Sequence, residues 1–381
     1  MKQVITTEHV PIKLWLDDID ETALTQAKNL ANLPFAYKWI AVMPDCHTGY
    51  GMPIGGVLAA QEVIVPNAVG VDIGCGMLAV RTDLLEITPA ALHEIIAQIK
   101  QVIPVGFKHH LTDQPWSGLD RAPDVGVIQK ELASARRQLG TLGGGNHFIE
   151  IQHGSDGHIW LMIHSGSRNF GLQTATFFHK RAVVSCEKGK VHLPDRDLSF
   201  LSMDTQDGRD YFLAMRYCCD FARANRALMM EKTLEILARV TRGRQLEAID
   251  IHHNYADLED HYRRAVLVHR KGATKASMDM VGIIPGSMGT RSYIVRGLGN
   301  PESFESCSHG AGRRMGRKEA IRSLKLEEEQ KKLTGILNGL HSRGGLDEAP
   351  GAYKDIDVVM RNQKDLVEVT IALTPLASIK G

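Results

Sequence analysis

The sequence predicts an α+β fold, organised as a single large domain over residues 1–381 with mixed β-sheets and flanking helices. Short apolar runs alternate with glycine-rich turns over residues 35–82, a pattern typical of strands in a mixed sheet. Other segments repeat apolar residues at helical spacing. Turns that carry reactive side chains are spread from residue 45 to residue 380, without a linker, low-complexity tract or repeat. We therefore expect one domain to assemble one site.

Composition narrows the class of protein. The chain has 381 residues, 43% of them hydrophobic, and a formal net charge of +1, which still allows nucleic-acid binding through a local basic patch. The first residues contain no apolar signal segment, and no apolar run approaches the roughly eighteen residues of a membrane span. Six cysteines without a CxxC pair predict reduced thiols. We expect a cytoplasmic protein without a membrane partner.

Strands are expected where apolar runs end in turns. The expected strands cover residues 39–43, 51–58, 77–80, 159–164, 248–254 and 366–373, and residues 266–272 and 281–289 are expected to form further strands and turns. Residues 44–51, which include Asp45, Cys46 and His47, predict a polar turn between the first two strands. Residues 106–126 predict a long polar loop.

Three helices are expected. Thr88 is a good N-cap before Pro89, and the helix that follows carries an apolar face of Leu92, Ile95, Ile96 and Ile99. Residues 207–240 give the longest helical pattern, and a charged helix is predicted at about 316–340. In the long helix one stripe holds Leu213, Tyr217, Phe221, Ala224 and Leu228, and Cys218 and Cys219 are interpreted as packing residues.

A glycine-rich turn, Gly70-Val71-Asp72-Ile73-Gly74-Cys75-Gly76, places a carboxylate and a thiol three residues apart. A thiolate and a carboxylate are both ligands for divalent metals. A buried structural cysteine beside a turn-capping aspartate explains this turn equally well.

Histidines at the ends of apolar runs favour the metal interpretation. His147, His164 and His253 each lie in a tight turn or at a strand end, although any one of them alone is better explained as an ordinary core or surface histidine. Strand alternation predicts that only one of His252 and His253 faces the cluster. Ligands from distant segments are unlike structural zinc sites and indicate a catalytic site, with zinc and manganese both possible.

His309 lies among small residues in Ser308-His309-Gly310-Ala311-Gly312-Arg313, which leaves room for a phosphate. Backbone N–H groups of such a turn, the following helix and nearby arginines can hold phosphate, and a neutral imidazole can attack phosphorus. The alternative is a glycine-rich helix start with a solvent-exposed histidine. A Walker A sequence is absent.

In combination these motifs resemble the RtcB family of RNA ligases, over nearly the whole chain. The motifs are Met43-Pro44-Asp45-Cys46-His47, Gly70 to Gly76, Gly144-Gly145-Asn146-His147-Phe148-Ile149-Glu150, His164 to Arg168, His253-Asn254, Pro285 to Thr290, His309 to Arg313, and Lys380-Gly381. The family joins a 2′,3′-cyclic-phosphate or 3′-phosphate RNA end to a 5′-hydroxyl end with GTP and manganese.

The resemblance implies a role for each matching residue. Two Mn²⁺ ions would be held by Asp72, Cys75, His147, His164 and His253, with the Cys75 thiolate shared. His309 would attack the α-phosphate of GTP and form a guanylyl-histidine. Contacts with the nucleotide are implied for Asn146, Phe148, Glu150, Ser287, Ser292, Gly310, Ala311, Gly312, Arg313, Tyr353 and Lys380. Contacts with the RNA phosphate are implied for Arg168 and Asp45.

Some positions depart from the family pattern. Asn169-Phe170 and Gly316 stand where the family more often has glycine with a small residue and serine. These departures concern the choice of RNA substrate more than the chemistry of ligation. We expect either tRNA splicing or membership of a bacterial branch that repairs ribosomal RNA with a release-factor-like partner. Two alternatives without a covalent nucleotide are a metal-dependent phosphoesterase or nuclease and a catalytically idle RNA-binding protein.

Overall fold

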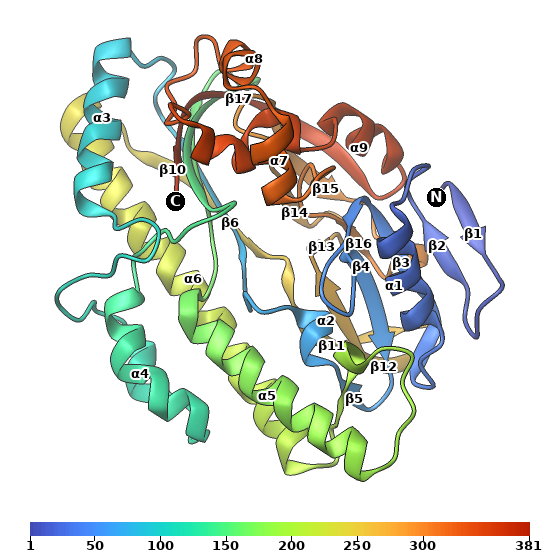
Figure 1. The fold of residues 1–381 in the computed structure, drawn as a ribbon. Coiled ribbons are helices and arrows are strands. Elements are labelled where there is room, and N and C mark those ends of the chain that lie inside the picture. The colour runs from blue at the N-terminus through green and yellow to red at the C-terminus, as the bar shows by residue number, and fades with distance from the viewer.

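Two large sheets form the centre of the computed structural model, which describes residues 1–381 (Figure 1). The first has the order β1 (Gln3–Ile5), β2 (Ile12–Leu14), β3 (Ala36–His47), β4 (Ile54–Ala60), β12 (Arg264–Lys271), β11 (Asn254–His261). The second has the order β10 (Gln245–His252), β6 (Gly76–Thr82), β8 (Ile159–Ser165), β7 (Phe148–Gly154), β17 (Val367–Lys380), β15 (Ser292–Gly297), β14 (Val281–Ile284).

Two small ribbons complete the strands. They pair β13 (Ala273–Lys275) with β16 (Ser306–Ser308), and β5 (Val63–Ile64) with β9 (Leu201–Ser202). Only β2 and β3 pair in parallel, and the other strand pairs are antiparallel. The predicted α+β class with mixed sheets is confirmed.

Helices α3 to α6 lie together on one side of the sheets, whereas α1 lies beside β3 (Figure 1). The helices are α1 (Glu21–Ala31), α2 (Pro66–Val69), α3 (Pro89–Val102), α4 (Gly126–Gln138), α5 (Arg168–Lys188), α6 (Gln206–Thr241), α7 (Arg317–Ser323), α8 (Leu326–Lys332) and α9 (Ile356–Asn362). No helix is both long enough and apolar enough to cross a membrane.

The two strongest helix predictions are confirmed. The Thr88 side chain accepts the N–H of Ala91 at 3.2 Å and caps α3. The long helix is α6, which Thr205 caps through the N–H of Gly208. The predicted stripe is wrong at Leu213, which is 50% exposed, because the buried face follows neighbouring positions.

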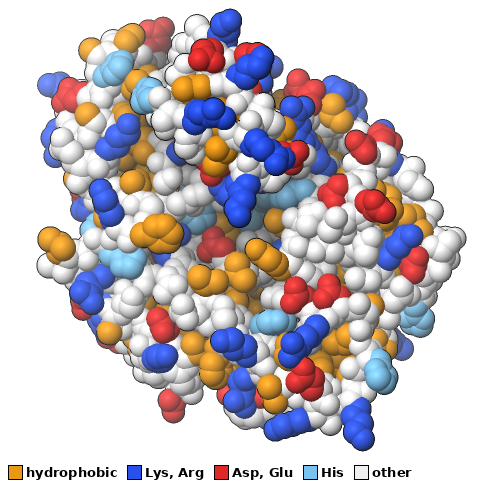
Figure 2. All heavy atoms as spheres, viewed as in Figure 1, with side chains coloured by type: hydrophobic (Ala, Val, Ile, Leu, Met, Phe, Trp, Pro, Cys, Tyr) orange, Lys and Arg blue, Asp and Glu red, His pale blue; other side chains and the backbone are white.

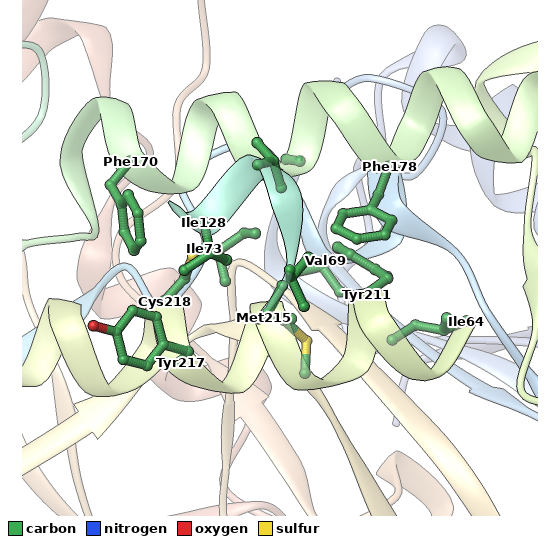
Figure 3. Packing of buried hydrophobic residues seen from close by; sticks show 14 of the residues in the cluster. Ile64, Val69, Ile73, Ile128, Phe170, Phe178, Tyr211, Met215, Tyr217 and Cys218 are labelled. Atoms are coloured by element: carbon green, nitrogen blue, oxygen red, sulfur yellow. The ribbon is translucent and has the colours of Figure 1, made fainter. Parts of the chain in front are cut away.

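A hydrophobic cluster between α5 and α6 anchors the glycine-rich turn (Figure 3). Phe170 and Phe178 of α5 pack with Tyr211 and Cys218 of α6. Ile73 belongs to the same cluster, so burying this apolar surface also fixes the turn that carries Asp72 and Cys75. Cys218 is fully buried, as its interpretation as a packing residue predicted.

Other element predictions need correction. Residues 45–47 were expected in a turn but continue β3, where a register irregularity between Val42 and His47 bends the strand without ending it. The helix expected at about 316–340 is two short helices, because Leu324 has an extended backbone between α7 and α8. The loop predicted at 106–126 includes a short 3₁₀ helix, Ser117–Arg121, and runs to the start of α4.

Candidate metal and nucleotide site

The glycine-rich turn from residue 70 to residue 76 holds its two donors through close packing on α6. Gly74 has a φ of 70°, and a Cβ there would lie 2.8 Å from the Cα of Cys219. The N–H of Gly74 donates to the carbonyl of Asn254 at 2.7 Å, and the N–H of Cys75 donates to the carbonyl of Asp72 at 3.1 Å. The turn thus directs Asp72 and Cys75 toward the carboxyl end of β10.

All five predicted metal ligands meet in one continuous cluster. The Sγ of Cys75 lies 3.3 Å from Nε2 of His164 and 3.5 Å from Nε2 of His147. Nε2 of His147 lies 3.0 Å from a carboxylate oxygen of Asp72, and Nε2 of His164 lies 3.3 Å from Nε2 of His253. The donor atoms of Cys75, His147 and His164 all lie within 4.8 Å of one another, close enough for a single ion.

Backbone carbonyls fix which ring nitrogen of two histidines is free. Nδ1 of His147 lies 2.9 Å from the carbonyl of Leu142, and Nδ1 of His164 lies 3.0 Å from the carbonyl of Asn146. A carbonyl only accepts, so each Nδ1 donates its proton; Nε2 of His164 then presents a lone pair, whereas Nε2 of His147 faces the carboxylate of Asp72. Metal-bound histidines usually show this arrangement. Burial lowers the pKa of His164 and His253, so both imidazoles are neutral.

This donor set fits a divalent cation. Two neutral Nε2 atoms and a sulfur face one another, and Nδ1 of His253 is buried without a hydrogen-bond partner. Burial raises the pKa of the Cys75 thiol, but a bound cation would favour the thiolate. Burial would also raise the pKa of Asp72, yet the hydrogen bond from His147, its charge and that of Arg168 hold it at about 2.

His252 takes no part in the cluster. Its Nδ1 contacts the carbonyl of Gly74 at 3.0 Å and the guanidinium of Arg226 at 3.3 Å. Only His253 therefore faces the other histidines, as strand alternation predicted.

His309 lies next to the cluster with its ring oriented by Asp45. The ring centroids of His309 and His253 are 4.8 Å apart. One carboxylate oxygen of Asp45 accepts from Nδ1 of His309 at 2.6 Å and from its backbone N–H at 3.0 Å. The same oxygen accepts the N–H of Gly310 at 3.3 Å. Asp45 is fully buried, and this geometry leaves Nε2 of His309 with a free lone pair.

Strand register brings the predicted guanine-reading residues together. In the β17–β7 pair Lys380 lies opposite Phe148 and Ser378 opposite Glu150. The ammonium of Lys380 lies 4.9 Å from the centroid of the Phe148 ring. Burial raises the pKa of Glu150 to about 7, although the charge of Lys380 opposes the shift.

A hydrogen-bonded chain links Glu150 to Ser292 and to the backbone beside Ser287. Gln152 donates to Glu150 at 2.8 Å and to Oγ of Ser292 at 3.1 Å. Oγ of Ser292 accepts the N–H of Gly286, the residue before Ser287, at 3.2 Å. The predicted nucleotide residues of β7, β15 and β17 therefore share one region.

Sequence reasoning missed Glu348, the centre of a charged group. Its carboxylate accepts from Tyr353, from Arg313 at 3.1 Å and from Arg317 at 2.5 Å, and it lies 3.7 Å from the ammonium of Lys380. Tyr353, Arg313 and Lys380 were predicted as nucleotide residues, so one carboxylate orients three of them. No spacing in the sequence connects Glu348 with these partners.

The small-residue turn after His309 is engaged within the chain. The N–H of Ala311 donates to the carbonyl of Pro285 at 3.0 Å, and the carbonyl of Gly312 accepts the N–H of Lys354 at 2.9 Å. Arg314, in contrast to Arg313, donates to the carbonyl of Gly351 at 2.8 Å and lies outside the Glu348 group.

Arg168 begins α5 behind the ligand turn. Its Nη1 lies 3.3 Å from Nδ1 of His147, and its Nε donates to Oγ1 of Thr141 at 3.4 Å. The guanidinium lies directly under Gly143, where a Cβ would come within 2.0 Å of Nη2. Burial lowers the pKa of Arg168 below its usual value.

Two further residues missed from the sequence hold these turns together. Asn225 of α6 accepts the N–H of Thr141 at 3.1 Å and donates to the carbonyl of Thr141, the hydroxyl of Ser165 and the carbonyl of Gly166. Arg226 donates to the carbonyls of Gly74 and Ser165, each at 3.0 Å, and pairs with Asp250. The only available signal was a polar pair inside the apolar pattern of α6.

An α+β fold with five clustered metal donors beside an oriented imidazole defines a metal-binding protein with a candidate catalytic histidine. The chain belongs to the RtcB family, because the family model described as "tRNA-splicing ligase RtcB" matches residues 26–122 and 116–381. This confirms the resemblance found in the sequence.

Named relatives cover almost the whole chain. "RNA-splicing ligase RtcB" of Escherichia coli K12 is 41% identical over 409 residues, covering 100% of this chain and 99% of the relative. "tRNA-splicing ligase RtcB" of Pyrobaculum aerophilum is 33% identical and covers 98% and 95% respectively. "RNA-splicing ligase RtcB" of Mycobacterium tuberculosis H37Rv is 33% identical and covers 93% and 100%.

Proposed function

We propose that this chain is an RNA ligase that joins 2′,3′-cyclic-phosphate or 3′-phosphate RNA ends to 5′-hydroxyl ends through a guanylyl group carried on His309. The observation that carries this proposal is the His309 imidazole, held by Asp45 and 4.8 Å between ring centroids from His253 of the five-donor cluster. Membership of a family whose members are named RNA-splicing ligases supports the activity.

His309 acts as the nucleophile toward GTP in this proposal. Asp45 keeps the proton on Nδ1, so the Nε2 lone pair attacks the α-phosphate. A nitrogen–phosphorus bond forms, and the bond to the leaving pyrophosphate breaks. Because the Asp45 carboxylate is buried against His309, we assign it to positioning this ring, and a contact with RNA phosphate is left to Arg168.

Two divalent cations, manganese by family resemblance, would be held by Asp72, Cys75, His147, His164 and His253. When bound, such ions supply Lewis-acid stabilisation of charge on phosphate oxygens. The chain's own contribution is to hold imidazoles and a sulfur in a buried cluster through the carbonyls of Leu142 and Asn146.

The guanine base would lie between Phe148 and Tyr353. The Glu150 carboxylate accepts from guanine N1–H and N2–H₂, and Lys380 donates to O6, a pattern that adenine does not match. Further nucleotide contacts are proposed for Asn146, Ser287, Ser292, Gly310, Ala311, Gly312 and Arg313.

The RNA steps follow from the chemistry of the guanylyl group. Water first opens a cyclic phosphate end to a 3′-phosphate by breaking the bond from phosphorus to the 2′-oxygen, and Arg168 holds the resulting 3′-phosphate. The 3′-phosphate then takes GMP from His309, and the imidazole leaves. The 5′-hydroxyl finally displaces GMP and seals the strand. We propose that residues 1–381 work as one domain in the cytoplasm, on cleaved tRNA or ribosomal RNA, the latter with a release-factor-like partner.

The alternative of a phosphoesterase or nuclease would use His309 as a general acid without a covalent nucleotide. The metal donors alone allow that activity and also an idle RNA-binding protein. The grouping of Phe148, Glu150 and Lys380 favours the ligase, because a simple hydrolase does not need to recognise a guanine.

Covalent labelling tests the proposed function. With Mn²⁺ and α-labelled GTP, the wild-type protein should acquire acid-labile label, and His309→Ala should acquire none while its circular dichroism stays unchanged. His192→Ala, which removes an exposed histidine, is the matched control and should label normally. Label from γ-labelled GTP would contradict the nucleotidyl mechanism.

A further inference from the structure

A fully exposed phenyl ring lies on the loop between α3 and α4. Phe107 has a relative exposure of 102% and Leu111 of 96%, the two highest among the large hydrophobic side chains. Neither belongs to a hydrophobic cluster of the fold. Single exposed apolar residues are common on protein surfaces, so exposure alone assigns no function to Phe107, and its position relative to the site has to be considered.

The loop is tied directly to the turn that covers Arg168. The N–H of Gly106 donates to the carbonyl of Gly143 at 2.7 Å, and Val105 forms a bridge with the same residue. Gly143 lies against the Arg168 guanidinium, so closely that any side chain at this position would clash with it. Phe107 therefore directly follows the residue that is hydrogen-bonded to Gly143, and Gly143 contacts Arg168, the arginine proposed to hold the RNA phosphate.

Basic residues lie on the same loop and on α4, which the loop contacts. Lys108 and Arg137 are exposed, and the N–H of His110 donates to the carbonyl of Arg137 at 3.0 Å. Burial and then the charge of Arg168 lower the pKa of His109, which indicates that this histidine lies within the field of the arginine. Figure 2 shows side chains of all the coloured kinds, basic, acidic, histidine and hydrophobic, around the hollow near the centre of this face.

We propose that Phe107 stacks on the terminal nucleobase of the RNA strand whose 3′-phosphate lies at Arg168. Aromatic rings beside cationic groups are the usual means of holding single-stranded nucleic acid, because every base has a π face and every nucleotide a phosphate. This inference rests on the proposed function. It adds a contact to the terminal base that does not depend on the RNA sequence. This contact would keep the 3′-phosphate in place while GMP is transferred from His309.

The variant Phe107→Ala should weaken ligation at low RNA concentration. We expect the KM for a 3′-phosphate oligonucleotide to rise about 5- to 100-fold, the range of a lost base–aromatic stack. Phe107→Trp should keep the KM near the wild-type value. Phe107→Leu should raise the KM as Phe107→Ala does, because an aliphatic side chain keeps the apolar surface but has no ring. Leu85→Ala is the matched control, since Leu85 is 59% exposed beyond the opposite end of β6.

A substrate with an abasic 3′-terminal nucleotide provides the paired change. For the wild-type protein, the KM should rise on this substrate by as much as the Phe107→Ala change raises it on the normal substrate. For Phe107→Ala, the KM should rise little further when the base is removed. Additive losses would show that the ring and the base do not meet, which would overturn the proposal.

A direct binding measurement separates this inference from the ligase proposal. An oligonucleotide with 2-aminopurine at the 3′-phosphate end should lose fluorescence on binding wild-type protein but not Phe107→Ala. Equal quenching by both proteins would overturn the stacking, whatever the ligation assay gives. Failure of α-labelled GTP to mark His309 in wild-type protein would instead overturn the proposed function, because that step uses no RNA.

Discussion

At the scale of single residues, the position of one proton decides what each imidazole can do. His147 and His164 donate Nδ1–H to backbone carbonyls, whereas His309 donates to the carboxylate of Asp45. A carboxylate makes its imidazole more electron-rich than a carbonyl does, because it carries a full negative charge. The same side chain therefore suits ligation of a metal at two positions and attack on phosphorus at the third.

Glu150 predicts a pH dependence of GTP binding. Burial raises its pKa to about 7, so in the free protein the carboxylate is mostly protonated below that pH and mostly ionised above it. Only the ionised form accepts both guanine N–H groups. The affinity for GTP should therefore rise about tenfold between pH 6 and pH 8, measured by direct binding.

Glu150→Gln is the control for this titration. It should bind GTP more weakly, with a flat pH profile, because the amide does not ionise over this range. A rise in affinity that persists in the variant would assign the titration to another group.

How far single residues could be predicted depended on the distance to their partners. Cys75, His147, His164 and His253 were predicted because each lies in a turn or at a strand end. Their meeting in one cluster is what the structure adds. Glu348, Asn225 and Arg226 had no such local mark, since their roles depend on partners far along the chain.

At the scale of elements, α6 fastens three separate ligand-bearing turns. Asn225 bonds to Thr141 and Ser165, and Arg226 bonds to Gly74 and Ser165. These bonds are side chain to backbone or hydroxyl and are fully buried. One helix thus sets the relative positions of His147, His164 and Cys75.

The variant Asn225→Ala should test this clamp. It leaves the buried N–H and carbonyl of Thr141 without their partner, so we expect a loss of about 1–3 kcal/mol in the free energy of unfolding. Manganese content should fall as well. Denaturant unfolding and metal analysis measure the two effects.

Glu231→Ala, an exposed change on the same helix, should alter neither quantity. A full metal content in Asn225→Ala would mean that the turns hold their positions without α6.

Helix predictions succeeded where the periodic pattern was plain. α3 was predicted from its Thr88 cap and apolar face and α6 from its long periodic pattern, whereas α1, with its Asp20 cap and buried face, was not predicted. α5 was not predicted, although its buried Phe170, Thr174, Phe178 and Ala182 recur every four residues, because polar residues interrupt the pattern. The strand β3 continues through Asp45 because its pairing tolerates an irregularity that the sequence does not signal.

At the scale of the whole molecule, the proposed metal donors join widely separated parts of the chain. Asp72 and Cys75 precede β6, His147 precedes β7, His164 ends β8 and His253 follows β10. Ions that bind only this assembled set stabilise the entire fold by mass action.

Manganese should therefore raise the thermal midpoint of unfolding. At a hundred times its dissociation constant the expected stabilisation is about 2.7 kcal/mol, and a chelator should remove it. Cys75→Ala should bind less manganese and lose most of this response in a thermal scan.

Cys186→Ala removes another buried cysteine, on α5, and should keep the response even if its starting midpoint is lower. An unchanged manganese stoichiometry in Cys75→Ala would remove this thiol from the ligand set.

The separation of the donors also has a consequence for biosynthesis. Asp72 and Cys75 leave the ribosome long before His253, and α6, which clamps their turn, is made between the two. A nascent chain that ends before residue 253 can present only part of the donor set to an ion. Completion of the donor set is thus deferred until translation has passed the long helix, so a polysome-bound fragment lacks the complete centre.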